Sequence, residues 1–466
     1  MITSSSKRRG VGFFSLCLAF FVIMLDTTLI PFLYPLLISD LGLKVSQAAA
    51  VNNLYLIAYA GTLLIGGKLG DTKDRKKVFL IGLLVLGAGS ILGAFSNKYS
   101  LILIARFVMG LGAGLITPQS MAFISSMFES NARGLAFGIW GAVASVGTGL
   151  GPVVAKVATT VGFWEIAFWI NVPMVLLSLV TAAIGLKAVH SGRTLSFQQI
   201  SLPVIAGLSL MTFVYGVQLL SPDGRDIKVS VIMLVVTFIF GLVAIKLRIN
   251  GLIAPLVNFN KVERSPYRAA VFASALLGGS LTAYYLPLSL SFSYVWKFEE
   301  MTIIYLMVFA SVINAIFGVL AGTWSNKWGT KRLIISGLTI FSISCFLFAW
   351  LAIAEEIEKK FLIVMLIGVL ALAEVGMGIA FGPLANSSMK VVHNEIVSEA
   401  AAFYNWVRQT FSAVGGVCIA FVTAAALQGA DYSNPRAVGI ASFAGFTTVS
   451  IALLMGAVIS KGVKNA

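Results

Sequence analysis

The feature that most constrains the fold of this chain is a succession of fourteen apolar stretches, which run from one end of the sequence to the other. A helix of about 20 apolar residues is long enough to cross the hydrocarbon core of a bilayer. Because that core offers the backbone no water, every amide needs a partner in the protein, and a helix supplies it. The fourteen predicted spans cover residues 11–38, 47–67, 78–96, 101–128, 134–157, 164–186, 198–220, 229–247, 267–292, 301–323, 332–353, 362–388, 398–425 and 437–460. The sequence therefore predicts an all-α polytopic membrane protein.

Composition argues against the other classes to which a basic chain can belong. Hydrophobic residues make up 58% of the 466 residues and charged residues 11%, whereas roughly a quarter of an ordinary soluble domain is charged. The net charge of +15 does not indicate a nucleic-acid partner, because the basic residues lie in short turns between apolar stretches. The three cysteines lie far apart without metal-ligand spacing, so we expect packed thiols and no metal site.

The Lys and Arg residues fall unevenly between the two sides of the predicted membrane. With the N-terminus inside, 22 of the 33 lie in cytoplasmic segments and 9 in outer segments. Cytoplasmic loops of membrane proteins carry such an excess of basic residues. We therefore expect both termini to be cytoplasmic, as an even number of spans requires.

A charged turn occurs twice in the sequence. The first copy, GKLGDTKDRKK at 67–77, joins the second and third spans, and a weaker copy, GTWSNKWGTKR at 322–332, joins the tenth and eleventh. In the second copy, Asn326 stands at the position that corresponds to Asp71. One turn at matching places in two apolar halves is typical of an internally repeated transporter. Eight helices separate the copies rather than six, so we expect two helices inserted between two six-helix bundles. The predicted domains are a first bundle at 1–190, the inserted helices with a linker at 191–266, and a second bundle at 267–466.

The residue types in the first turn suit a conformational gate. Gly67 permits close approach of a neighbouring helix. Asp71 can accept hydrogen bonds from a helix N-terminus or pair with a base. Arg75 and Lys76 can reach cytoplasmic acids or lipid headgroups. A merely solvated basic turn is the alternative, and repetition at the matching place counts against it.

These motifs carry a resemblance to a known family. The pattern G-x-L-x-D-x-x-x-R-K resembles the signature turn of the major facilitator superfamily. ARFVMGLGAGLITP at 105–118 resembles the fourth-helix motif of its proton-driven members, and SVGTGLGPVVAKV at 145–157 resembles the fifth-helix motif of antiporters. MLDTTLIPFLYPLL at 24–37, FWEIAFWINVP at 163–173 and FYNWVRQTFSAVGG at 403–416 resemble the fourteen-helix drug:proton antiporter branch.

The resemblance implies a bacterial multidrug efflux protein in the cytoplasmic (inner) membrane. Such a protein is a monomer that uses the proton gradient rather than a cofactor, with an amphipathic small molecule, protons and the lipid bilayer as its partners. Gly151 and Pro152 of the fifth-helix motif would then allow tight helix contact and a bend, although ordinary helix packing also uses such residues. The chain departs from the family pattern at Asp74, where the turn usually has glycine, at Ala155–Lys156, and at Ile30–Pro31.

Charged residues inside the predicted spans are the strongest physical signal, because each costs at least about 2.5–3.5 kcal/mol at the bilayer centre. Asp26 lies roughly 22 Å from the inner end of its span, and Arg106 lies roughly 8 Å from the outer end of its own. The two depths match, so we expect Asp26 and Arg106 to meet. We favour proton coupling at Asp26 over a static ion pair, because burial and a nearby cation act in opposite directions on a carboxylate.

Glu374 and Arg408 also lie near the middle of their spans. Glu374 would either pair with Arg408 or face the cavity as a second protonation or cation-binding site, and both interpretations stand at this point. The residues expected to line an amphipathic substrate cavity are Tyr34, Tyr284, Asn405, Trp406 and Arg408.

Together these patterns predict a secondary transporter that exports amphipathic, cationic or neutral compounds in exchange for protons by alternating access. The alternative is a proton-coupled exporter of an endogenous lipid or metabolite, which would share every motif. A membrane enzyme is disfavoured because the sequence has no phosphate-binding loop, metal cluster or nucleophile elbow. A non-transporting membrane sensor is disfavoured because the charged motifs are intact.

Overall fold

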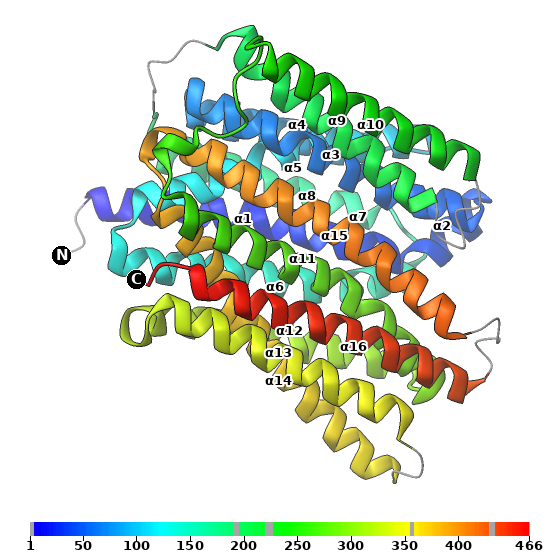
Figure 1. The fold of residues 1–466 in the computed structure, drawn as a ribbon. Coiled ribbons are helices and arrows are strands. Elements are labelled where there is room, and N and C mark those ends of the chain that lie inside the picture. The colour runs from blue at the N-terminus through cyan, green and yellow to red at the C-terminus, as the bar shows by residue number, and fades with distance from the viewer. Residues whose placement is uncertain (1–3, 190–194, 220–226, 355–357, 428–433, 466) are drawn as a thin grey trace. The chain divides into compact units, whose positions relative to one another are not determined.

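The computed structural model describes residues 4–189, 195–219, 227–354, 358–427 and 434–465, and these segments are almost entirely helical (Figure 1). Fourteen of the helical segments are long and apolar enough to cross a membrane, which confirms the predicted number of spans. The α-helices are α1 (Ser4–Phe32), α2 (Tyr34–Leu41), α3 (Val45–Thr72), α4 (Arg75–Ala94), α5 (Tyr99–Met127), α6 (Ser130–Val161), α7 (Ile166–Trp169), α8 (Asn171–Gly185), α9 (Phe197–Leu219), α10 (Ile227–Ile249), α11 (Arg264–Leu290), α12 (Glu300–Trp328), α13 (Thr330–Ile353), α14 (Lys359–Lys390), α15 (Val397–Leu427) and α16 (Pro435–Ile459).

The first predicted span is not one continuous helix in the structure, because the helix is interrupted at Leu33, between α1 and α2. Pro35 occupies the first turn of α2. Proline fits there because that position needs no backbone donor, whereas in a helix interior it removes a hydrogen bond. α2 ends at Leu41, and the next residue is Gly42, whose φ of 63° is left-handed and favours glycine. The sixth predicted span is also divided in the structure, into α7 and α8, with Ile170 between them.

The helices group into two compact units. Unit 1 contains 1–130, 143–263 and 389–406, and unit 2 contains 131–142, 264–388 and 407–466. The two inserted helices, α9 and α10, therefore belong to unit 1. The predicted boundary at 190/191 lies outside the described residues.

Close helix contacts organise unit 1. The sequence GLGAG in α5 brings its backbone against both α3 and α4. A Cβ atom added at Gly110 would lie 2.4 Å from the carbonyl oxygen of Tyr55, and one at Gly112 would lie 2.5 Å from the amide nitrogen of Leu86. Backbones at this separation require glycine. The inserted helix α9 packs on α3 in the same manner, since a Cβ at Gly207 would lie 2.2 Å from a carbonyl oxygen of α3.

The linker after α10 pairs with the segment that precedes α15. Val262 and Val392 form an isolated antiparallel bridge. The amide of Glu263 donates to the carbonyl of Val391 at 3.0 Å, and Lys261 forms an ion pair with Glu395. All of these residues belong to unit 1. This pairing was not foreseen from the sequence.

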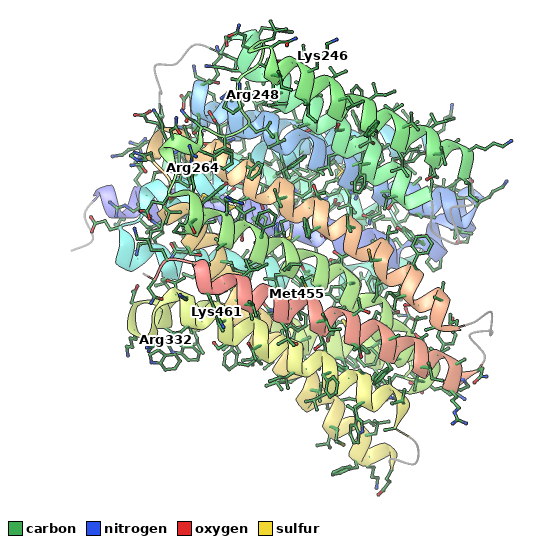
Figure 2. The ribbon with its side chains drawn as sticks, in the orientation of Figure 1. Lys246, Arg248, Arg264, Arg332, Met455 and Lys461 are labelled. Atoms are coloured by element: carbon green, nitrogen blue, oxygen red, sulfur yellow. The ribbon has the colours of Figure 1, made fainter. Side chains whose placement is uncertain are left out.

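The core of unit 2 is an aromatic and aliphatic cluster between α11, α13, α14 and α16. The ring of Tyr284 contacts Phe341, Phe348 and Phe446 at centroid distances of 5.4, 6.0 and 6.0 Å. Figure 2 shows Arg264, Arg332 and Lys461 at one end of the helices of unit 2. That end is the one at which the sequence predicts a cytoplasmic face.

Candidate functional site

Asp26 and Arg106 form a buried ion pair in unit 1, as their matching depths predicted. Asp26 lies on α1 and Arg106 on α5, and their side chains are fully buried. Oδ2 of Asp26 accepts from the Arg106 guanidinium, while Oδ1 accepts from the side-chain amide of Asn171 at 3.2 Å. The carboxylate therefore has one cationic and one neutral donor in a water-poor position.

The guanidinium of Arg106 has further partners that hold it in place. Its Nε donates to the carbonyl of Val51 at 3.1 Å, and Nη2 approaches the side-chain oxygen of Asn52 at 3.4 Å. The guanidinium carbon lies 4.3 Å from the ring centroid of Tyr55, which is a cation–π distance. Protonation of Asp26 would remove the only formal charge among these partners, so the cation would lose its compensation.

Sequence reasoning missed Asn171, Asn52 and Tyr55 as partners of this pair. Asn171 stands in the stretch FWINVP, which was quoted only for its family resemblance. A lone amide side chain in an apolar run was the available signal, because such a group needs a partner when it is buried.

The charged turn at 67–77 binds the start of α15 within unit 1. Asp71 is buried, and its two carboxylate oxygens accept from the backbone amides of Ser398 at 3.1 Å and Glu399 at 2.7 Å. It also pairs with Arg75 at 3.1 Å. Both predicted partners of Asp71, a helix N-terminus and a base, are therefore confirmed, and its negative charge lies at the positive end of the α15 dipole.

Further bonds strengthen this contact, which we call the turn latch (Lys68, Asp71 and Arg75 with Ser398 and Glu399). Lys68 pairs with Glu399 at 2.9 Å, and Nε of Arg75 donates to the Ser398 hydroxyl at 3.0 Å. All five residues of the latch are buried.

Gly67 permits the close approach of α3 and α15 that the latch needs. A Cβ atom at Gly67 would lie 2.3 Å from Cβ of Ala402 and 2.6 Å from the carbonyl oxygen of Ser398. Lys76 differs from expectation, because its ammonium donates to the carbonyl of Ala183 at 2.6 Å rather than to an acid or a headgroup.

Asp74, the departure from the family pattern, has a structural role in the same turn. It caps α4, because its side chain accepts from the amide of Lys76 at 3.0 Å and from that of Val189 at 3.2 Å. Gly151 of the fifth-helix motif lies against α1, where an added Cβ would fall 2.2 Å from the hydroxyl of Thr28. Pro152 lies within the continuous helix α6. Asn326 in the second copy of the turn is exposed on α12 of unit 2.

Glu374 is the second buried intramembrane acid, and it lies on α14 of unit 2. Its Oε2 accepts from the side-chain amide of Asn314 on α12 at 2.9 Å. Glu374 forms no ion pair within the part of the chain that the structure describes, which answers the question of its pairing with Arg408. The guanidinium of Arg408 instead lies 5.3 Å from the ring centroid of Phe381.

Tyr284 and Tyr285 of α11 lie within electrostatic range of the Glu374 carboxylate. The Tyr284 hydroxyl is buried without a hydrogen-bond partner among the described residues. Tyr284 was expected to line a cavity, but here only 1% of its surface is exposed.

The other expected cavity residues are buried or half-buried. Asn405 is buried in unit 1, where its side-chain amide donates to the carbonyl of Ala401 at 2.8 Å. Trp406 is half-buried and stacks on Phe403. Tyr34 is half-buried at the start of α2.

Comparison with known proteins gives a consistent result. The family model described as "Major Facilitator Superfamily" matches residues 16–416. The riboflavin transporter RibZ of Clostridioides difficile is 24% identical over 82% of this chain and 81% of its own length. The multidrug efflux pump LfrA of Mycolicibacterium smegmatis is 24% identical over 73% of this chain and 67% of its own length. Two other relatives are 32% and 30% identical to this chain, but their alignments cover only 39% and 37% of the relatives' own lengths.

Among solved structures, the human organic anion transporter MFSD10 (TETRAN) has a TM-score of 0.70. The match covers 98% of this chain and 100% of the other at 14% identity. This likeness supports the fold alone.

Proposed function

Because the chain belongs to the major facilitator superfamily, we propose that it exports amphipathic, cationic or neutral compounds in exchange for protons. The observation that carries the proposal is the buried Asp26–Arg106 pair, in which a carboxylate that can bind a proton is also the partner of a fixed cation. Intramembrane ionisable groups of this kind mark proton and substrate pathways. The proposed location is the cytoplasmic membrane of a bacterium, with a monomeric chain and both termini in the cytoplasm.

Proton binding at Asp26 would favour one orientation of the transporter. A protonated Asp26 no longer attracts Arg106, which then has only neutral partners in a position that water does not reach. The cation would be stabilised again either by deprotonation of Asp26 or by a rearrangement of α1 against α5. Deprotonation of Asp26 and rearrangement of α1 against α5 are alternative ways to stabilise the cation, so proton binding is coupled to the change of conformation.

The turn latch would act as the gate. Residues 389–406 come from the second half of the sequence, although they group with unit 1. Alternating access separates the two halves on one side at a time, so the latch bonds would have to break in each cycle. Glu374, which lacks a cationic partner among the described residues, would serve as a second proton site or bind a cationic substrate.

The test is proton-coupled efflux by purified protein in proteoliposomes, followed with a pH-sensitive dye. Asp26→Asn keeps the size and hydrogen-bonding capacity of the side chain but removes its titratable proton. We expect it to abolish uphill efflux while substrate binding stays measurable. Normal proton flux through Asp26→Asn would sink the mechanism, and loss of coupling in Glu374→Gln alone would move the proton site to unit 2.

The alternative substrate class is an endogenous lipid or metabolite, and the resemblance to a riboflavin transporter is the observation in its favour. The same proteoliposomes distinguish the two. A compound panel containing cationic dyes, neutral drugs, flavins and neutral lipids should show the greatest proton release with cationic and neutral drug-like members. Transport restricted to a flavin or a lipid would replace the drug-export proposal with the alternative.

A further inference from the structure

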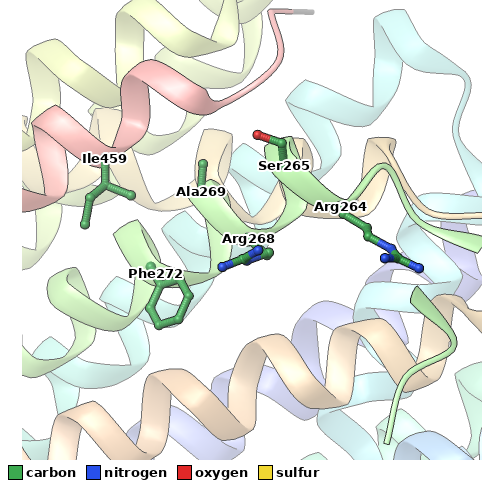
Figure 3. Close-up of a pocket in the computed structure, with 6 residues that line it drawn as sticks. All are labelled: Arg264, Ser265, Arg268, Ala269, Phe272 and Ile459. Atoms are coloured by element: carbon green, nitrogen blue, oxygen red, sulfur yellow. The ribbon is translucent and has the colours of Figure 1, made fainter. Parts of the chain in front are cut away.

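A pocket of about 400 Å³ opens beside the first turns of α11 in unit 2 (Figure 3). None of the residues that line it belongs to the Asp26–Arg106 pair, the turn latch or the surroundings of Glu374. Its walls are Arg264, Ser265, Arg268, Ala269 and Phe272 of α11 and Ile459 of α16. We call it the α11 pocket.

One wall of the α11 pocket is charged at the start of α11 and apolar further along the helix. Arg264, Arg268 and Phe272 follow one another at intervals of four residues, which places them on one face of the helix. Figure 3 shows the side chains of Arg264, Arg268 and Phe272 projecting from the same side of α11, with Ile459 of α16 above Phe272. At the helical rise per residue, the wall changes from guanidinium to aromatic ring over roughly 12 Å.

Both arginines of the α11 pocket lie at the protein surface. Both Arg264 and Arg268 are exposed, and Arg268 forms neither a hydrogen bond nor an ion pair with any described residue. Phe272 is 44% exposed two turns further into the helix. The pocket therefore presents exposed positive charge next to uncovered hydrophobic surface.

The position of the pocket along the helices suits the boundary between headgroups and hydrocarbon. α11 begins at Arg264, and the last apolar helix ends at Ile459, so both elements that form the pocket terminate at its level. Figure 2 places Arg264 and Lys461 at the same end of unit 2. Phe272 then lies at the depth of acyl chains.

We propose that the α11 pocket binds an anionic phospholipid, with its phosphate between Arg264 and Arg268 and an acyl chain over Phe272 and Ile459. Guanidinium groups bind phosphate with paired, charge-assisted hydrogen bonds. Basic pockets between transmembrane helices are suited to acidic lipid headgroups. The ligand is inferred from charge complementarity and from the charged-to-apolar order of the wall, and it does not depend on which substrate the protein transports.

The experiment measures retention of phosphatidylglycerol by native mass spectrometry and its affinity in nanodiscs of phosphatidylcholine with increasing phosphatidylglycerol. Arg264→Gln/Arg268→Gln is compared with Lys246→Gln/Lys327→Gln, which removes two exposed basic residues elsewhere. We expect the pocket variant to bind roughly thirtyfold more weakly, or roughly fivefold for each arginine, and the control variant to stay within twofold.

Two further arms complete the test. Arg264→Lys/Arg268→Lys keeps the charge and should recover most of the affinity, which separates lipid binding from a folding defect. Inorganic phosphate and phosphatidylcholine alone should not compete at millimolar concentration. Equal loss in the pocket and control variants would show a diffuse surface-charge effect and overturn the proposal, as would full competition by inorganic phosphate.

Discussion

Asp71→Asn provides the sharpest test of the turn latch. The carboxylate accepts from the amides of Ser398 and Glu399 with separate oxygens. An asparagine has one oxygen, so whichever way its amide is turned, an NH₂ group faces one of the two backbone donors. That donor loses its bond, and the remaining bonds to Arg75 and to the α15 N-terminus lose their charge.

The magnitude follows from these bonds. A hydrogen bond to a charged group contributes about 1.5–3 kcal/mol, and loss of the charge at a helix terminus costs a further ~0.3–1 kcal/mol. The latch should therefore weaken by about 2–4 kcal/mol. Because ~1.4 kcal/mol is tenfold in an equilibrium constant, the open population should rise roughly 30- to 700-fold.

Hydrogen exchange at the amides of Ser398 and Glu399 reports this opening directly, because these backbone N–H groups donate hydrogen bonds to Asp71. We expect their exchange to accelerate by the same factor in Asp71→Asn, with substrate binding retained and turnover slowed. Asp74→Asn is the matched control in the same turn. Asparagine caps a helix as well as aspartate does, so exchange at the start of α15 should not change. Wild-type protection in Asp71→Asn, or equal acceleration in both variants, would refute the latch.

Three further outcomes are expected. Gly67→Ala should open the latch in the same exchange assay, because its Cβ has no room, whereas Gly10→Ala, with nothing within 4 Å, should not. Arg106→Ala should lower the free energy of unfolding by about 3–5 kcal/mol, because it leaves Asp26 buried without its cation. The double variant Arg106→Ala/Asp26→Asn should recover part of that loss in a thermal unfolding assay. Glu374→Gln should unfold at the same or a higher temperature than the wild type, because it replaces a buried ionisable group that has no cationic partner among the described residues, while affinity for cationic dyes falls in fluorescence titrations. A marked drop in its melting temperature would instead indicate that the charge of Glu374 stabilises unit 2.

The number of spans could be predicted from the sequence because length and hydropathy decide whether a helix crosses a bilayer. The depth of a residue within its span could be predicted for the same reason, and matching depths correctly predicted that Asp26 and Arg106 are in contact. The direction in which a side chain points around its helix could not be predicted. A membrane helix is apolar on nearly every face, so its sequence carries little signal of which side contacts protein.

That missing direction explains the failures at the site. Glu374 and Arg408 have similar depths, yet the partner of Glu374 is Asn314, a neutral residue that no charge pattern identifies. The backbone amides of Ser398 and Glu399 carry no sequence signature at all, so Asp71 could be assigned a kind of partner but not its location. The break at Leu33 was missed because the apolar run continues through it.

The pairing of Val262 with Val392 makes the two inserted helices part of the machinery around the latch. The strand-like residues that leave α10 are hydrogen-bonded to the residues that enter α15, only six positions before the amides held by Asp71. A displacement of α15 would therefore pull on a tether anchored at the other end in α9 and α10. Shortening or loosening that tether would change how far the start of α15 can travel, even though Val262 and Val392 are not themselves members of the turn latch.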